Sequence, residues 1–84
     1  MNLRIALAKA IRSARKKKNL TQEDFGIVSS RTYLSTLERG LKSPTIDKLD
    51  EICNTMGVHP AAVVLAAYAA MDAPSVSEAR KKLS

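Results

Sequence analysis

The chain contains very few residues of the types that build metal centres and disulfides. Its 84 residues include one cysteine, Cys53, and one histidine, His59. A single cysteine excludes an internal disulfide, and one Cys with one His leaves a zinc finger without enough ligands. We expect Cys53 to be a buried core thiol, with a redox sensor as the alternative. This cysteine content fits a reducing, cytoplasmic setting.

Signals for catalysis and cofactor binding are also missing. The sequence contains three glycines but no glycine-rich phosphate loop, and its potential metal ligands do not stand at metal-binding spacing. His59 precedes Pro60, where we expect it to cap a helix rather than act as a general base. We therefore predict no enzyme activity, no catalytic residue, no metal, no cofactor and no small-molecule effector.

Long apolar runs are absent as well. Charged residues interrupt positions 1–9 every few residues, unlike the apolar core of a signal peptide. The most apolar stretch, residues 60–71, is about half of the roughly 20 residues that cross a bilayer. We expect this stretch to be a packed helix, and we expect neither export nor a membrane partner.

What the chain has in excess is positive charge. Its 14 Lys and Arg residues oppose 8 Asp and Glu residues, which gives a formal net charge of +6. Half of the basic residues lie within residues 1–20, where there is no acid. This excess indicates a polyanionic partner, although solubility alone is the plainer explanation. The run from Arg15 to Lys18 either steers the protein toward a polyanion or is an ordinary solvated helix end.

Apolar residues recur at helical spacing, and no stretch alternates as a strand does. The pattern predicts one all-α domain, residues 1–72, followed by residues 73–84 as a basic tail or a short sixth helix with a capping box from Ser75 to Glu78. In the fourth helix the apolar face begins at Ile46 and Leu49. The five expected helices are about residues 3–17, a short helix from Thr21, one from Ser29 or Ser30 to Gly40, one from Thr45 to Gly57, and one opening at His59 and Pro60.

The second and third helices are too close in the sequence to lie side by side, so they cross steeply, as in a helix-turn-helix. Residues 11–24, IRSARKKKNLTQED, and residues 33–40, YLSTLERG, together resemble the phage repressor/Cro (XRE) helix-turn-helix family. The likeness covers about residues 7–64. It implies a lambda-repressor-like bundle of about five helices that binds double-stranded DNA. The interval from Glu23 to Thr32 is shorter than is usual in the family, so the second helix is clipped or the turn after it is tighter.

The resemblance places the third helix in the major groove of DNA, with its outward N-terminal residues at the base edges. The expected base contacts are Arg31, Thr32, Ser35 and Thr36. Arg31 is the strongest candidate because its guanidinium fork can bind guanine O6 and N7 together. The alternative for all four residues is a solvated polar face.

Phosphate contacts are expected on both sides of that helix, from Thr21, Gln22, Ser30, Arg39, Lys42 and Ser43. The first three stand at helix starts, where free amides and the helix dipole attract anions, although capping alone accounts for Thr21 and Ser30. Arg39, Lys42 and Ser43 lie in a loop that resembles the family's second segment that binds the DNA backbone.

Arg15 and Glu38 match an ion pair typical of the family. We expect a structural bridge rather than a DNA contact, with an ordinary surface pair as the alternative.

Together these observations predict a small sequence-specific transcriptional regulator, acting as a repressor, that binds double-stranded DNA as a homodimer. The expected dimer contacts are Val64, Leu65, Tyr68 and Met71, unless these residues are core. The alternative is a protein-binding module of antitoxin or adaptor type with secondary DNA binding. A third interpretation is nonspecific nucleic-acid binding.

Overall fold

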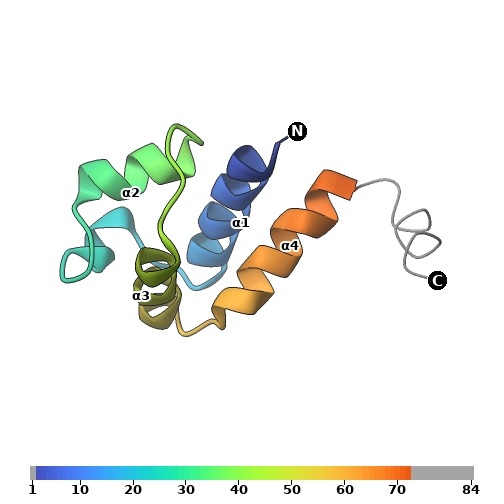
Figure 1. Ribbon diagram of the computed structural model, residues 1–84. Coiled ribbons are helices and arrows are strands. Elements are labelled where there is room, and N and C mark those ends of the chain that lie inside the picture. The colour runs from blue at the N-terminus through green and yellow to red at the C-terminus, as the bar shows by residue number, and fades with distance from the viewer. Residues whose placement is uncertain (1, 73–84) are drawn as a thin grey trace.

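The computed structural model describes residues 2–72, in which all regular structure is helical (Figure 1). Four α-helices and one 3-10 helix follow one another: α1 Leu3–Lys17, η1 Gln22–Phe25, α2 Arg31–Glu38, α3 Ile46–Met56 and α4 Pro60–Asp72. The predicted all-α class is therefore confirmed. The helix after Thr21 is short, as expected, but it is a single 3-10 turn rather than an α-helix. Residues 73–84, with the expected capping box from Ser75 to Glu78, lie outside the described residues.

Local capping determines where α1 begins and ends. Asn2 Oδ1 accepts a hydrogen bond from the Ile5 amide at 2.9 Å, which satisfies one of the amides that a helix start leaves free. Just past the other end, Asn19 has a φ of 57°, a left-handed conformation typical of a residue that follows a helix. Three basic residues occupy the last turn, where the negative end of the helix dipole favours them. The predicted extent of α1 is confirmed.

A compact turn joins η1 to α2. The amides of Val28 and Ser29 both donate to the carbonyl of Phe25, at 3.0 and 2.8 Å, and the Phe25 side chain is fully buried. Ser30 then caps α2, because its hydroxyl accepts a hydrogen bond from the Tyr33 amide at 3.0 Å. The short interval noted in the sequence is thus accommodated both by the reduction of the second helix to one 3-10 turn and by this tight turn.

α3 also has the predicted ends, but one expected core residue lies outside the core. Thr45 Oγ1 accepts a hydrogen bond from the Lys48 amide at 3.1 Å, and Gly57 ends the helix with a φ of 70°. The expectation that Ile46 is buried is wrong, since its side chain is 80% exposed. Ile46 is the first residue of the helix and lies at the edge of the apolar face centred on Leu49, so no earlier turn helps to cover it.

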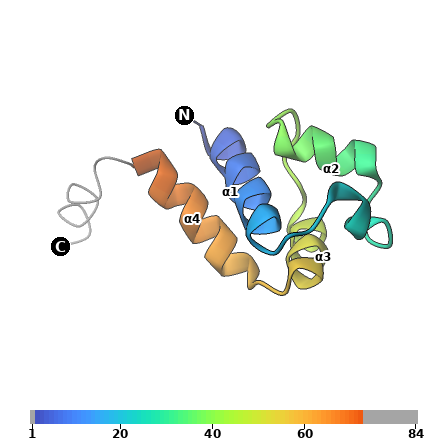
Figure 2. The same ribbon diagram turned by 180° about the vertical axis from the view of Figure 1, so that it is seen from behind.

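The core lies between the helices, and each of the five contributes at least one residue to it. Its buried members are Ile11, Phe25, Leu34, Leu37, Leu49, Ile52, Cys53, Met56 and Val63. α1 packs against both α2 and α4, and the two opposite views place these helices on different sides of it (Figure 1, Figure 2). The η1–α2 region and the α1–α4 region therefore form two separate surfaces.

Cys53 is fully buried, which confirms that it is a core thiol. Burial raises the pKa of Cys53 to about 11, with a smaller contribution from the negative charge of Asp50. None of the helices within residues 2–72 could cross a membrane by itself, and α3 and α4 reach the required length and apolar character only as a pair bent by 105°.

Candidate nucleic-acid interface

α2 buries Leu34 and Leu37 and directs polar residues outward. An open hollow of about 430 Å³ lies along its outer face, lined by Gln22, Arg31, Thr32, Ser35, Thr36 and Arg39. This hollow brings together all four expected base-contacting residues and two of the expected phosphate-contacting residues. Arg31 and Thr32 are exposed, whereas Ser35 and Thr36 are half-buried. The Thr36 hydroxyl donates to the Thr32 carbonyl at 2.8 Å, so its methyl group and a lone pair remain for a ligand.

The other expected phosphate-contacting residues do not line this hollow but come shortly before or after its residues in the sequence. Thr21 and Ser30 are exposed at the starts of η1 and α2, and Arg39, Lys42 and Ser43 are exposed after α2. Gln22 is partly buried, and its amide Nε2 donates to Glu38 Oε1 at 3.3 Å. Gln22 is therefore already used in part to hold η1 against α2.

Glu23 is a neighbour of Arg31 that we did not single out from the sequence. Arg31 Nη1 lies 3.1 Å from Glu23 Oε1, and both side chains remain about 70% exposed. An exposed pair of this kind is worth little to stability and can open when a better partner arrives. An acid in the first turn of a helix is favoured by the helix dipole, so the sequence offered no reason to expect a partner for Glu23.

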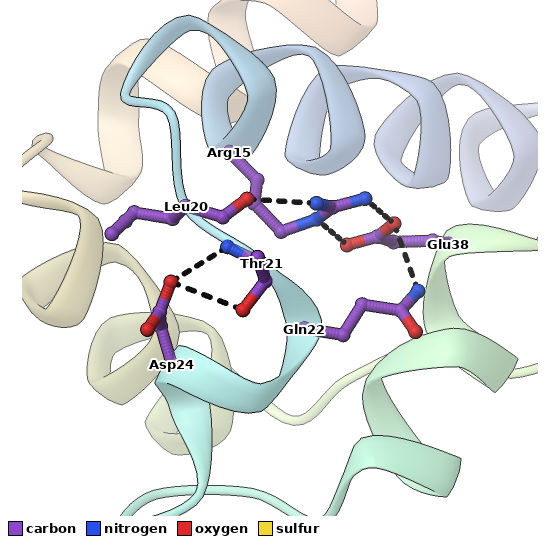
Figure 3. Close-up of polar contacts among 6 residues, drawn as sticks. All are labelled: Arg15, Leu20, Thr21, Gln22, Asp24 and Glu38. Carbon is purple, nitrogen blue, oxygen red and sulfur yellow. Dashed lines mark hydrogen bonds and ion pairs between the residues drawn. The ribbon is translucent and has the colours of Figure 1, made fainter.

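A buried ion pair connects the end of α1 to the end of α2 (Figure 3). Arg15 Nε lies 2.7 Å from Glu38 Oε2, and Arg15 Nη2 donates to Glu38 Oε1 at 2.9 Å, a two-pronged arrangement. The remaining Arg15 nitrogen, Nη1, donates to the Leu20 carbonyl at 2.8 Å. The hydrogen bonds to Glu38 raise the pKa of Arg15 above its ordinary value. This network fixes three parts of the chain relative to one another: α1, the segment at Leu20, and α2.

Lys48 holds the turn before α2 from the other side. Its Nζ donates to the Val28 carbonyl at 2.6 Å, lies 3.0 Å from Glu51 Oε2, and stands 6.0 Å from the centroid of the Tyr33 ring. The start and the end of α2 are thus anchored by different residues. Arg31 therefore projects from a helix that contacts hold in place at both ends.

Comparison with known proteins shows which family has this arrangement. The helix-turn-helix family model matches residues 11–63. The chain belongs to the XRE-type helix-turn-helix family. Members of this family are DNA-binding transcriptional regulators.

Two relatives of this helix-turn-helix protein match most of its length. It is 32% identical over 62 residues to the control protein C.BamHI of Bacillus amyloliquefaciens, covering 70% of this chain and 76% of the relative. It is 38% identical over 60 residues to y4dJ of Sinorhizobium fredii, described as an uncharacterized HTH-type transcriptional regulator, covering 69% and 78%.

Crystal structures of the clp gene regulator ClgR from Corynebacterium glutamicum are similar in fold. One superposes with a TM-score of 0.79 at 36% identity, covering 84% of this chain and 95% of that chain. Another has a TM-score of 0.82 at 32% identity and covers 99% and 90%.

The helix-turn-helix protein also carries an apolar helix with little cover. Between Pro60 and Met71, α4 has no charged residue, yet only Val63 and Ala67 are buried. Among the expected dimer contacts, Leu65 is 71% exposed and Tyr68 is 49% exposed, while Val64 and Met71 are half-buried. A helix that is apolar on all sides is usually covered on all sides.

Proposed function

We propose that the protein is a small repressor that binds specific double-stranded DNA by inserting α2 into the major groove. One observation carries this proposal: Arg31, Thr32, Ser35 and Thr36 line a single open hollow on a helix anchored at both ends. The similarity to a control protein, C.BamHI, and to two regulators, y4dJ and ClgR, agrees with a role in gene regulation.

Arg31 carries the base reading in this proposal. Its guanidinium is exposed and, within residues 2–72, is paired with the exposed carboxylate of Glu23, so it can exchange Glu23 for guanine O6 and N7. Thr32 and Thr36 offer methyl groups to thymine or hydroxyl groups to either partner, and Ser35 offers a hydroxyl group.

The DNA backbone is bound on either side of α2. Thr21, Gln22 and Ser30 contact one phosphate segment, and Arg39, Lys42 and Ser43 contact the other. These contacts orient α2 without reading sequence.

We further propose that two copies pair through α4. Leu65 and Tyr68 form an exposed apolar face, and Val64 and Met71 lie at its edge. Exposed apolar faces of this kind are typical of surfaces that bind another protein. A two-fold dimer would read a palindrome whose half-sites are about one turn of DNA apart. Such a dimer represses by occupying its site.

Selection of bound sequences from a random DNA pool tests the proposal, because it reveals the half-site, the spacing and the symmetry together. On the selected site, Arg31→Ala should weaken binding by about 1–3 kcal/mol and relax the preference at one base pair. Lys17→Ala, a matched loss of charge on α1 away from the hollow, should cost less and should act equally on all sequences.

Other results would overturn the proposal. Equal losses for both variants on every DNA would indicate nonspecific binding. A stable complex with another protein and no selective DNA binding would indicate a protein-binding module.

A further inference from the structure

A groove of about 440 Å³ runs between α1 and α4. α4 itself lies on the side of α1 that faces away from α2 (Figure 1, Figure 2). Most of the lining of the groove is apolar, and the residues that supply this part are Ala6, Ala10, Ala14, Val58, Ala62, Val63, Ala66 and Ala70. None of these residues belongs to the hollow along α2. The groove is therefore a second concave surface, separate from the DNA-binding one.

The polar edge of this groove carries charge of one sign. Lys9, Lys17 and Lys18 line it, together with Ser13. The edge continues on the outer face of α1 into a shelf lined by Lys9, Arg12, Ser13, Lys16 and Lys17. No acidic residue lines either surface within the described part of the chain. The groove thus combines an apolar floor with a positive margin.

The proposed dimer leaves this groove open. On α4, Ala62, Ala66 and Ala70 line the groove, whereas Leu65 and Tyr68 do not. Residues 65 and 68 lie on a different side of the helix, since successive residues turn by about 100°. Pairing through Leu65 and Tyr68 therefore covers one side of an apolar helix and leaves the other uncovered.

We propose that the α1–α4 groove binds an acidic amphipathic helix of a partner protein. Its apolar side chains would pack against the alanine-rich floor, where the small side chains leave room for larger ones. Its carboxylates would face Lys9, Lys17 and Lys18 and, farther out, Arg12 and Lys16. The apolar floor supplies affinity, and the positive margin selects an acidic partner over a basic one.

Charge argues against two other occupants, and the apolar floor argues against a third. Residues 73–84 contain one acid, Glu78, against Arg80, Lys81 and Lys82, so this segment is repelled by a lysine margin. A second copy carries the same net charge of +6, and its α4 offers no carboxylate between residues 60 and 71. Nucleic acid would use the lysines but would gain nothing from the apolar floor.

A peptide selection tests the proposal. A displayed library of helical peptides, with randomised surface positions, is selected for binding to the full chain. The enriched peptides should carry Asp and Glu beside one apolar stripe. When an enriched peptide is added, the amide chemical shifts that change in NMR spectra of the protein should be those of the groove-lining residues rather than those of Leu65 and Tyr68.

Matched variants separate the groove from its surroundings. Ala66→Gln obstructs the floor of the groove and should lower the affinity for an enriched peptide by about tenfold or more. Ala69→Gln, on the same helix but outside the groove, should not lower this affinity. The double change Lys9→Glu and Lys17→Glu should give a similar loss, and Arg4→Glu, outside both surfaces, should have little effect. Circular dichroism checks that each variant folds.

Three results would overturn the proposal. They are no enrichment, enrichment of basic or uncharged peptides, and affinity that is insensitive to Ala66→Gln. None of these outcomes depends on DNA binding, so the peptide selection and the DNA selection can fail independently.

Discussion

The ion pair between Arg15 and Glu38 offers the sharpest test of how α2 is held. Glu38→Gln keeps the size of the side chain and removes its charge. In the parent protein, Glu38 accepts two hydrogen bonds from Arg15 and one from Gln22. The Arg15 side chain is only 12% exposed and the Glu38 side chain only 4%. In the variant, a guanidinium that cannot lose its proton stays in this site beside an amide that also brings N–H groups.

The structure sets the size of the expected loss. Removing one partner of a buried pair costs about 3–5 kcal/mol, whereas an exposed pair is worth about 0–1 kcal/mol. Arg15 retains the Leu20 carbonyl and slight access to water, so we expect a loss at the lower end, about 3 kcal/mol. A small domain has about 5–10 kcal/mol in total, so the variant should still fold.

Urea denaturation followed by circular dichroism measures this loss. Circular dichroism is the suitable signal because the chain has no tryptophan. With a slope of about 1 kcal/mol per molar urea for a chain of this size, the midpoint should fall by about 3 M. A loss below about 1 kcal/mol would refute the assignment of a desolvated pair.

A double variant provides the control. Arg15→Met with Glu38→Leu removes both charges together and should recover much of the loss, because well-packed apolar residues often replace a buried pair without cost. If the double variant is no more stable than Glu38→Gln, an unpaired charge is not the cause.

Three further predictions follow from other contacts. Glu23→Gln should leave the free energy of unfolding within about 0.5 kcal/mol of the parent, since its pair with Arg31 is exposed. It should bind the selected DNA site at least as tightly as the parent, because Arg31 no longer has to leave Glu23 before it reaches guanine; weaker binding of that site in mobility-shift titrations would contradict this exchange. Lys48→Met should cost about 1.5–3 kcal/mol by removing a charged hydrogen bond to the Val28 carbonyl, and a thermal melt with no shift would contradict this role. Burial raises the pKa of Cys53 to about 11 in the folded chain, so the thiol of the unfolded chain ionises at lower pH. The free energy of unfolding should therefore be unaffected by this thiol below about pH 9 and should fall as the pH rises toward 11. In denaturant titrations, the stability of Cys53→Ala should depend less on pH over that range.

The helices and most of their ends could be predicted from local patterns of amino acids. Ser30 and Thr45 cap helices through bonds to amides three residues later, and Gly57 ends α3 in a left-handed conformation. Each of these features involves a few consecutive residues, so the sequence contains the whole interaction. Leu34 and Leu37 stand at helical spacing in the sequence, and both are buried.

The contacts between residues far apart in the chain became visible only in the folded protein. Glu23 contacts Arg31, Lys48 contacts the turn at Val28, and Ile46 lies outside the core although its spacing fits the apolar face. The groove between α1 and α4 was equally hidden from the sequence. These contacts depend on the angles between helices, and such angles result from the packing of all the core side chains together, so no local pattern encodes any one of them.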